Sequence, residues 1–211
     1  MDKLPLARAG WPYVLGSLFL ALVASALQVW WLAVPLWIVF LLITNFFRDP
    51  PRASNAGPAA VLSPADGKVV VIQPASHPDL PGGDCLMVSI FMNIFDVHVN
   101  RAPLAGRVMR VTHHPGGFLP ADRPQAAISN ERSEMILASP EGPVIVVAQV
   151  AGLVARRIDC WVAGGVALAR GQRYGMIRFG SRLDIYLPPE ARVKVAAGQR
   201  TRAGQTVIAE V

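Results

Sequence analysis

The sequence predicts a mainly β fold: a β-rich sandwich or barrel-like domain that follows an N-terminal transmembrane helical hairpin. Three observations support this class. An apolar stretch without a charged side chain runs from Trp11 to Phe47. From Val61 onward, short β-branched runs alternate with glycine and proline turns, as in domains of many short strands. The chain of 211 residues, 53% of them hydrophobic, is long enough for a folded domain and too apolar to be disordered.

The apolar stretch is expected to cross the bilayer twice, as two short helices. As one helix, its 37 residues would span roughly 55 Å, whereas a hydrocarbon core is about 30 Å thick. Trp30 and Trp31, together with Gln28, mark a turn at the far interface, where tryptophan is enriched. Basic residues flank both ends of the stretch: Lys3, Arg8, Arg48 and Arg52. Because positive flanks favour the cytoplasm, residues 1–47 are predicted to anchor a cytoplasmic domain.

Two other interpretations of this segment stay open. Ala24-Ser25-Ala26 is typical of a signal-peptide cleavage site, although a second apolar run, from Val29 to Phe47, follows it directly. A re-entrant or interfacial helix pair would also bury the stretch. Residues 48–60 are rich in proline and alanine and are interpreted as a linker, so that the domain covers residues 61–211.

The domain is expected to consist of short strands joined by turns. The predicted strands are Lys68–Gln73, Leu86–Phe91, Phe95–Asn100, Gly106–Thr112, Met135–Ala138, Val144–Val150, Arg178–Leu187 and Arg192–Val195. The last segment, residues 193–211, resembles the hairpin of lipoyl-like β-sandwiches, with glycine turns at Gly198 and Gly204. Arg200-Thr201-Arg202 stands where those domains carry a lysine, so no swinging cofactor arm is expected.

Charge and cysteine content exclude several functional classes. The net charge is +6, but no basic run is long enough for a nucleic-acid-binding arm, so no nucleic acid partner is expected. Positive charge beside an apolar segment favours an anionic lipid surface instead. Cys85 and Cys160 form neither a zinc set nor a disulfide framework and are predicted to be free thiols in a reducing compartment.

The first candidate for chemistry is the pair Gly180–Ser181, which interrupts an otherwise continuous strand pattern between Tyr174 and Pro188. A β-bulge is one interpretation, because glycine often breaks a strand there. The other is self-cleavage. The Ser181 hydroxyl can attack the carbonyl of Gly180, whose missing side chain leaves the approach open. The peptide becomes an ester, elimination breaks the chain and leaves dehydroalanine, and hydrolysis gives a pyruvoyl group.

His98 and Asp66 are the next candidates. In the predicted strand before Pro103, Asp96, His98 and Asn100 share one face, and a histidine there can shuttle a proton. A surface or hydrogen-bonded histidine is the alternative. Asp66 precedes Gly67 in a turn that enters a strand, and it is either a turn residue or a carboxylate that orients a histidine.

The other histidines are not expected to bind a metal ion. His113 and His114 are neighbours on a predicted strand and therefore face opposite ways. A role in a substrate loop is more plausible for them, because Gly116 and Gly117 follow. His77 lies in a proline-rich loop and is expected to be solvated.

Several motifs occur together in a specific order. They are SPADGKV at 63–69, FMNIFDVHVNRAP at 91–103, NER at 130–132, AGLVARRI at 151–158 and GQRYGMIRFGSRLDIYLP at 171–188. Together they resemble the short, prokaryotic form of phosphatidylserine decarboxylase, from about Arg48 to Val211. The apolar N-terminal segment also fits that family.

The resemblance implies a proenzyme that cuts itself between Gly180 and Ser181. The β chain would be residues 1–180 and the α chain residues 181–211, and the two would stay together. Ser181 would become a covalent pyruvoyl group, with no pyridoxal phosphate and no metal. The mature enzyme would form a Schiff base with phosphatidylserine and release phosphatidylethanolamine and CO2, a step of phospholipid biosynthesis at the inner membrane. The family also suggests a homodimer.

The resemblance also implies roles for the candidate residues. His98 would take the Ser181 proton, and Asp66 would orient His98. Longer members carry two histidines in an HxxH spacing where this chain has His98 followed by Arg101, so His98 serves both self-cleavage and decarboxylation, or another group supplies the second function. Candidates for that group are Arg101, His113 and His114. Candidates for the lipid phosphate are Arg101, Arg178 and Arg182.

Two rival functions differ from this expectation. One is a membrane-anchored β-domain that binds or tethers without chemistry, which the lipoyl-like segment favours. The other is a pyruvoyl decarboxylase of a soluble amino acid, against which the membrane segment argues.

Overall fold

The computed structural model describes residues 5–120, 129–140, 142–152, 157–178 and 181–211. The chain divides into two compact units. The first, helical unit ends at Pro51, and the second, β unit runs from Arg52 to Val211. The division lies inside the segment that the composition marks as a linker.

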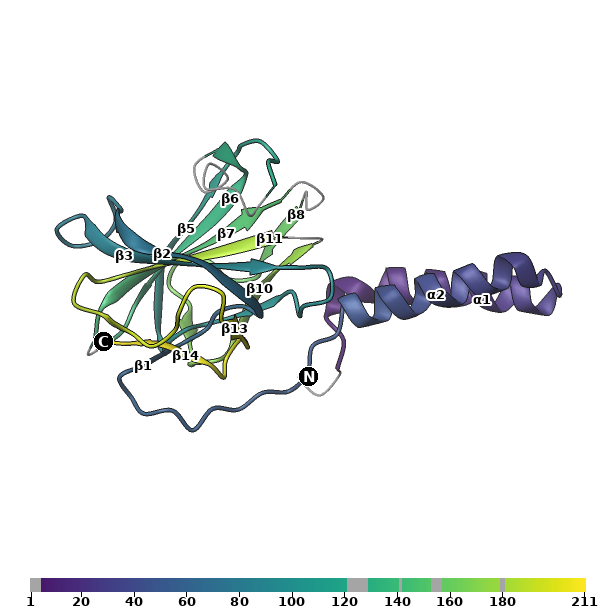
Figure 1. The fold of residues 1–211 in the computed structure, drawn as a ribbon, viewed down its shortest axis with the longest axis horizontal. Coiled ribbons are helices and arrows are strands. Elements are labelled where there is room, and N and C mark those ends of the chain that lie inside the picture. The colour runs from purple at the N-terminus through teal and green to yellow at the C-terminus, as the bar shows by residue number, and fades with distance from the viewer. Residues whose placement is uncertain (1–4, 121–128, 141, 153–156, 179–180) are drawn as a thin grey trace. The chain divides into compact units, whose positions relative to one another are not determined.

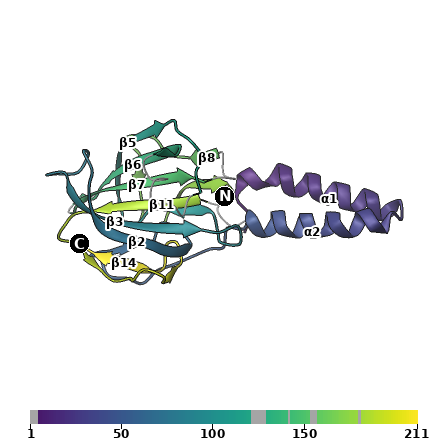
Figure 2. The ribbon, with the colours of Figure 1, turned by 45° about the horizontal axis from the view of Figure 1, so that its top comes forward.

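The helical unit is a hairpin (Figures 1 and 2). A 3-10 turn, η1 (Arg8–Gly10), leads into α1 (Trp11–Ala26), and α2 (Trp30–Phe46) returns beside it. The turn between the helices contains Gln28, whose φ is 59°. Small side chains, Ala21, Ala24 and Ala33, are buried in the unit and let the two helices approach each other closely.

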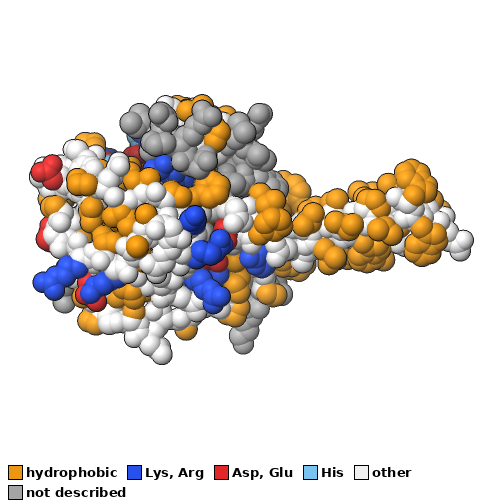
Figure 3. Space-filling model, in the orientation of Figure 1, with side chains coloured by type: hydrophobic (Ala, Val, Ile, Leu, Met, Phe, Trp, Pro, Cys, Tyr) orange, Lys and Arg blue, Asp and Glu red, His pale blue; other side chains and the backbone are white. Residues whose placement is uncertain are grey.

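The outer surface of this hairpin is apolar. Figure 3 shows hydrophobic side chains over most of its visible surface, and among the large exposed ones are Phe19, Leu27 and Trp31. The segment Arg8–Ala26 has 19 residues and is long and apolar enough to cross a membrane, whereas α2 is shorter, with 17 residues. By length and composition, α1 is therefore a candidate membrane anchor.

Over its described residues, the β unit contains one eight-stranded and two three-stranded sheets. The large sheet has the order β13-β2-β3-β11-β7-β6-β5-β9, and the small ones are β1-β14-β12 and β4-β10-β8. The large sheet curls, as Figures 1 and 2 show. The strands are β1 (Ala60–Leu62), β2 (Gly67–Ser76), β3 (Asp84–Met92), β4 (Val99–Arg101), β5 (Gly106–His114), β6 (Arg132–Ala138), β7 (Val144–Ala151), β8 (Arg157–Cys160), β9 (Ala167–Leu168), β10 (Arg173–Arg178), β11 (Ser181–Leu187), β12 (Arg192–Val193), β13 (Arg200–Thr201) and β14 (Val207–Glu210). The mainly β class predicted from the sequence is confirmed.

Strand β11 lies in the middle of the large sheet, antiparallel to β3 on one side and to β7 on the other. Its side chains alternate between two faces. Leu183, Ile185 and Leu187 join the main hydrophobic core. Arg182 and Asp184 point to the opposite face, where a smaller apolar cluster packs against Tyr186. Both faces of this strand are buried, so the large sheet is covered on each side at β11.

The predicted strand Phe95–Asn100 is wrong over most of its length, because β4 begins only at Val99. A turn replaces the start of that strand. Asn93 Oδ1 accepts from the backbone N of Phe95 at 2.8 Å, and Asp96 Oδ2 accepts from the backbone N of Asn93 at 3.0 Å. These short polar side chains satisfy the local backbone and compete with extended pairing.

The C-terminal segment contains the two glycine turns expected there, with φ of 91° at Gly198 and 71° at Gly204. Its strands separate, however. β12 pairs with β14, while β13, which lies between them in sequence, pairs with β2 of the large sheet. The segment therefore links two sheets.

Candidate active site

Ser181 is the first residue of β11 and is fully buried. Its strand partners are Met92 at the end of β3 and Ala151 at the end of β7. The Ser181 Oγ is buried and has no hydrogen-bond partner among the described residues. Because a buried polar atom normally finds a partner, this hydroxyl is an exception among the described residues. Gly180, the other half of the predicted cleavage site, lies outside the described residues.

An amide pair lies near Ser181 on the same face of the large sheet. Gln149 is two residues before Ala151 on β7 and is paired with Leu183, so alternation places Gln149 and Ser181 on one side. Gln149 Nε2 donates to Asn100 Oδ1 at 2.8 Å, and both side chains are fully buried. Gln149 Oε1 has no hydrogen-bond partner among the described residues.

Gln149 is not among the residues predicted from the sequence. The sequence feature that could have indicated Gln149 is a single amide inside the apolar run of β7, VIVVAQVA. A second feature that points to Gln149 is Gly175 on β10. A Cβ at Gly175 would lie 2.8 Å from Gln149 Nε2 and 2.6 Å from the Asp159 backbone O. The glycine therefore leaves room for the Gln149 amide.

His98 is fully buried in the connection between β3 and β4. Its Nδ1 lies 2.9 Å from the backbone O of Asp96. Because a carbonyl oxygen only accepts, Nδ1 carries the proton, which makes Nε2 the basic nitrogen of the neutral ring. The backbone O of His98 accepts from Ile177 N at 3.3 Å. This hydrogen bond connects His98 to Ile177 of β10, which lies four residues before Ser181 in the sequence.

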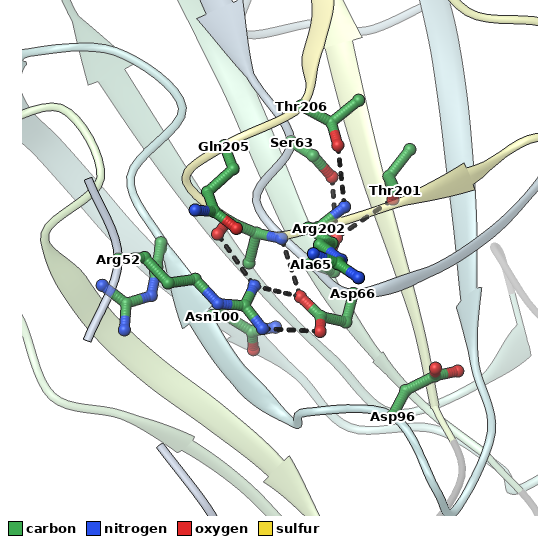
Figure 4. A network of polar contacts seen from close by, with 12 residues as sticks. Arg52, Ser63, Ala65, Asp66, Asp96, Asn100, Thr201, Arg202, Gln205 and Thr206 are labelled. Carbon is green, nitrogen blue, oxygen red and sulfur yellow. Dashed lines mark hydrogen bonds and ion pairs between the residues drawn. The ribbon is translucent and has the colours of Figure 1, made fainter. Parts of the chain in front are cut away.

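Asp66 is buried and held by two groups (Figure 4). Arg52 forms a bidentate ion pair with it, with Nη2 donating to Oδ2 at 2.7 Å. The backbone N of Ala203 donates to Asp66 Oδ1 at 2.7 Å. Asp66 thus links the start of the β unit to the C-terminal segment. Its role in orienting His98 stays a prediction.

The three arginines considered for the lipid phosphate all have protein contacts. Arg182 is 1% exposed, with Nε 2.6 Å from Asp184 Oδ1 and Nη2 donating to Ser89 Oγ at 2.8 Å. Burial raises the pKa of Asp184 although the charge of Arg182 opposes this. Arg178 pairs with Asp159 at 2.6 Å. Arg101 is buried and donates to the Gly171 backbone O at 3.2 Å.

A second polar cluster surrounds Glu134 on the face opposite Ser181. Glu134 Oε2 lies 2.9 Å from His114 Nε2 and 3.8 Å from His77 Nε2, and Oε1 accepts from Arg132 at 2.7 Å. Burial acts to raise the pKa of Glu134. Contacts from His77 and Arg132, with the charges of Arg132 and His114, outweigh burial and lower this pKa to about 2.

His77 is 6% exposed and packs on Tyr186, so the expectation that it is solvated is wrong. Among the described residues, His77, Asp79 and Glu134 bring their potential ligand atoms within 4.8 Å of one another. Both carboxylates already pair with guanidinium groups, those of Arg110 and Arg132. The His77 Nδ1 also accepts from the Asp79 backbone N at 3.3 Å, which fixes a proton on the Nε2 that faces Glu134. This cluster is an ion-pair network rather than a cation site.

Comparisons with known proteins place the chain in one family. Residues 39–209 match the sequence model of the family "Phosphatidylserine decarboxylase". A phosphatidylserine decarboxylase proenzyme of Cupriavidus pinatubonensis is 46% identical over 207 residues, which cover 98% of this chain and 95% of that protein. Proteins of the same name from Nitrosomonas eutropha and Burkholderia mallei are 46% and 43% identical, each over at least 97% of this chain and 94% of the relative. The chain therefore belongs to the phosphatidylserine decarboxylase family.

Proposed function

We propose that this chain is a self-cleaving proenzyme that decarboxylates phosphatidylserine to phosphatidylethanolamine and CO2 through a pyruvoyl group made from Ser181. The observation that carries the proposal is Ser181 itself. It is a buried serine at the start of a central strand, its Oγ has no partner among the described residues, and relatives of this chain are named proenzymes.

The self-cleavage step would use groups of this chain and one water molecule. The Ser181 Oγ attacks the carbonyl carbon of Gly180, and its proton passes to His98 Nε2, the basic nitrogen of the ring. The C–N bond between the two residues breaks as the ester forms, and the Ser181 amine gains a proton. Elimination then releases the Gly180 carboxylate and leaves dehydroalanine. Water hydrolyses the derived imine, releasing ammonia and leaving the pyruvoyl carbonyl.

The strand pairing supports a stable complex of the two chains after cleavage. Residues 181–187 form β11, which pairs with β3 and β7 of the larger chain. Further along the smaller chain, β13 pairs with β2 and β14 pairs with β1. Strands β3 and β7 of the larger chain would therefore hold the new N-terminus in its buried site, and β2 and β1 would hold the rest of the smaller chain.

The residues around Ser181 fit a pyruvoyl group at that position. The position is fully buried, which excludes bulk water. A pyruvoyl group there would supply an electron sink for the decarboxylation of an amino acid headgroup. His98 would return a proton to the α carbon. Gln149 Oε1, a buried acceptor on the Ser181 face, would accept a hydrogen bond from the substrate nitrogen.

The apolar helical unit supports a membrane location for this reaction. The segment Arg8–Ala26 is long and apolar enough to span a bilayer, which holds the diacyl substrate. Basic residues on both flanks of the hairpin favour a cytoplasmic position for the β unit at the inner membrane.

The test is intact mass spectrometry and CO2 release with detergent-solubilised protein. We expect the wild type to contain two chains, residues 1–180 and 181–211, the smaller one blocked by a carbonyl, and to release CO2 from phosphatidylserine. Ser181→Ala should remain a single chain of about 22.7 kDa and release none. Ser139→Ala, in the turn between β6 and β7, is the matched control and should process normally.

Two results would contradict the proposal. A wild-type chain that stays whole yet binds phosphatidylserine as well as Ser181→Ala does would indicate a tethering domain. A cleaved, carbonyl-blocked protein that releases CO2 from soluble serine but not from the lipid would indicate a different substrate.

A further inference from the structure

We propose that the turn between β3 and β4 is a membrane-docking element, which inserts Ile94 and Phe95 into the surface of an anionic lipid bilayer. This inference deepens the proposed function and rests on it, because the bilayer is where a diacyl substrate is found. The binding partner of this turn is the lipid surface. The turn belongs to the β unit and is distinct from the apolar helical unit.

The first observation is the exposure of two adjacent apolar side chains. Ile94 is 51% exposed and Phe95 is 60% exposed. A pair of large apolar residues at the tip of a turn is costly in water, and transfer into the interfacial region of a bilayer removes that cost. Phenylalanine and isoleucine carry no polar group that would need a partner there.

The second observation is that the turn is held rigidly in this conformation. Asp96 N donates to Asn93 O at 2.9 Å, and the side chains of the same two residues cap the backbone of the turn. Arg200 of β13 forms an ion pair with Asp96 from outside the turn. The apolar tip is therefore presented to its surroundings by a preformed scaffold, so docking costs little ordering entropy.

The third observation is the place of the turn in the chain. Met92, directly before the turn, is the strand partner of Ser181. His98, the candidate base, comes two residues after Asp96 and is fully buried. The docking turn is thus continuous at both ends with the candidate active site. A bilayer that receives its tip lies against the part of the domain where the headgroup must react.

The fourth observation is the charge around the base of the turn. Lys68 is paired in register with Phe91, the residue before Met92, and with Arg200 on the neighbouring strand. Lys68, Arg200 and Arg202 are all exposed. Asp96 offsets the charge of Arg200, which leaves Lys68 and Arg202 as a cationic surplus. Such a rim favours anionic headgroups, including that of phosphatidylserine.

The direct test places an environment-sensitive fluorophore on the tip of the turn in the full chain. Phe95→Cys is labelled in a background where Cys85 and Cys160 are replaced by alanine. Met109→Cys is the matched control, because Met109 is an apolar side chain, 58% exposed, on β5. Each protein is placed in vesicles of phosphatidylserine and phosphatidylcholine that carry spin-labelled acyl chains. A far-ultraviolet circular dichroism spectrum and a melting temperature like those of the wild type report that each variant has folded.

We expect the label at position 95 to shift to shorter wavelength and to be quenched, and the label at position 109 to do neither. Quenching at position 95 no stronger than at position 109 would overturn the inference. This measurement needs no turnover, so it judges the docking turn even if the proposed decarboxylation fails.

A kinetic test uses the double variant Ile94→Ser/Phe95→Ser, with Met109→Ser as the control. We expect the apparent KM for phosphatidylserine in vesicles to rise about three- to tenfold, because apolar burial in the interface is lost. Turnover of a dispersed short-chain phosphatidylserine should not change. An equal loss on both substrates would mean that the turn acts on the reacting groups, and no change on either would mean that it does not dock. Absence of CO2 release from the wild type would count against the proposed function instead.

Discussion

His98 is held by its own connection in the orientation that a general base needs. Its Nδ1 donates to the Asp96 backbone O at 2.9 Å, so the neutral ring has its lone pair on Nε2. That proton position is set by a local carbonyl two residues away. This local contact thus leaves Nε2 of the neutral ring as the nitrogen that can accept a proton.

We predict that His98→Ala slows self-cleavage by at least about 10²-fold, the usual contribution of a positioned base. The fraction of single chain is followed by gel electrophoresis after synthesis. His113→Ala is the control, because the His113 side chain is 56% exposed and pairs with Glu131 outside this connection. Normal cleavage of His98→Ala would remove His98 from the processing step.

Asp66 can be tested for a role beyond its ion pair with Arg52. The pair is largely buried, with 7% and 12% of the two side chains exposed, so losing either partner should destabilise the protein by about 3 kcal/mol. Asp66→Asn keeps an oxygen that can accept from Ala203 N, and Arg52→Met keeps Asp66. We predict that both variants lower the melting temperature, but that only Asp66→Asn slows cleavage. Equal cleavage rates in the two variants would restrict Asp66 to a structural role.

At the scale of the elements, β10 determines how closely the strands around the site approach. It pairs with β4 on one side and with β8 on the other. Gly175, in the middle of β10, faces the amide of Gln149 and the backbone of Asp159. The packing of β10, which ends just before the predicted cleavage site, therefore requires a residue without a side chain at position 175.

We predict that Gly175→Ala destabilises the protein by about 1–3 kcal/mol, because the new Cβ would lie 2.6 Å from a backbone oxygen that cannot rotate away. Urea unfolding measures this change. Gly57→Ala is the control, since a Cβ there meets nothing within 4 Å. Equal stability of the two variants would show that β8 and β10 can separate without cost.

The turn Asn93–Asp96 shows why one strand was predicted with the wrong bounds. Hydrophobic and polar residues alternate from Phe95 to Asn100, and this alternation predicts a strand over those residues. Asn93 and Asp96 instead bind the local backbone, and the strand begins only at Val99. Alternation reports which residues suit a strand, but short polar side chains can redirect the chain before it pairs.

For the molecule as a whole, Glu134, on the face of the large sheet opposite Ser181, makes the free energy of unfolding depend on pH. Glu134 is 9% exposed and contacts Arg132 and His114, and its pKa is about 2 instead of 4.5. A lowered pKa means that the unfolded chain binds the proton more readily. The contribution of Glu134 is therefore complete above pH 4.5 and is lost as the pH falls towards 2.

We predict that Glu134→Gln removes this part of the acid sensitivity. Between pH 5 and pH 2.5 the wild type should lose on the order of 1–2 kcal/mol more stability than the variant, after screening of a partly buried group. Thermal unfolding across this range checks it. Glu210→Gln is the control, because the Lys194–Glu210 pair is nearly half exposed. Parallel pH profiles for wild type and Glu134→Gln would contradict the assignment.

The mainly β class, the apolar helical segment and the ordered motifs around Ser181, His98 and Asp66 could all be predicted from the amino-acid sequence. These features depend on local patterns: a long uncharged stretch, short β-branched runs, and residue order within a motif. Each can be interpreted along the chain without knowing which segments meet.

The groups that surround those residues could not be predicted without the folded structure. It brought Asn100 and Gln149 together beside the Ser181 strand, bound Asp66 to Arg52 and Ala203, and buried Arg182 on the opposite face. These contacts join residues far apart in sequence, and sheet register chooses them. A shift of one residue in β11 would exchange Ser181 and Arg182 between the two faces, and packing of the whole core excludes it.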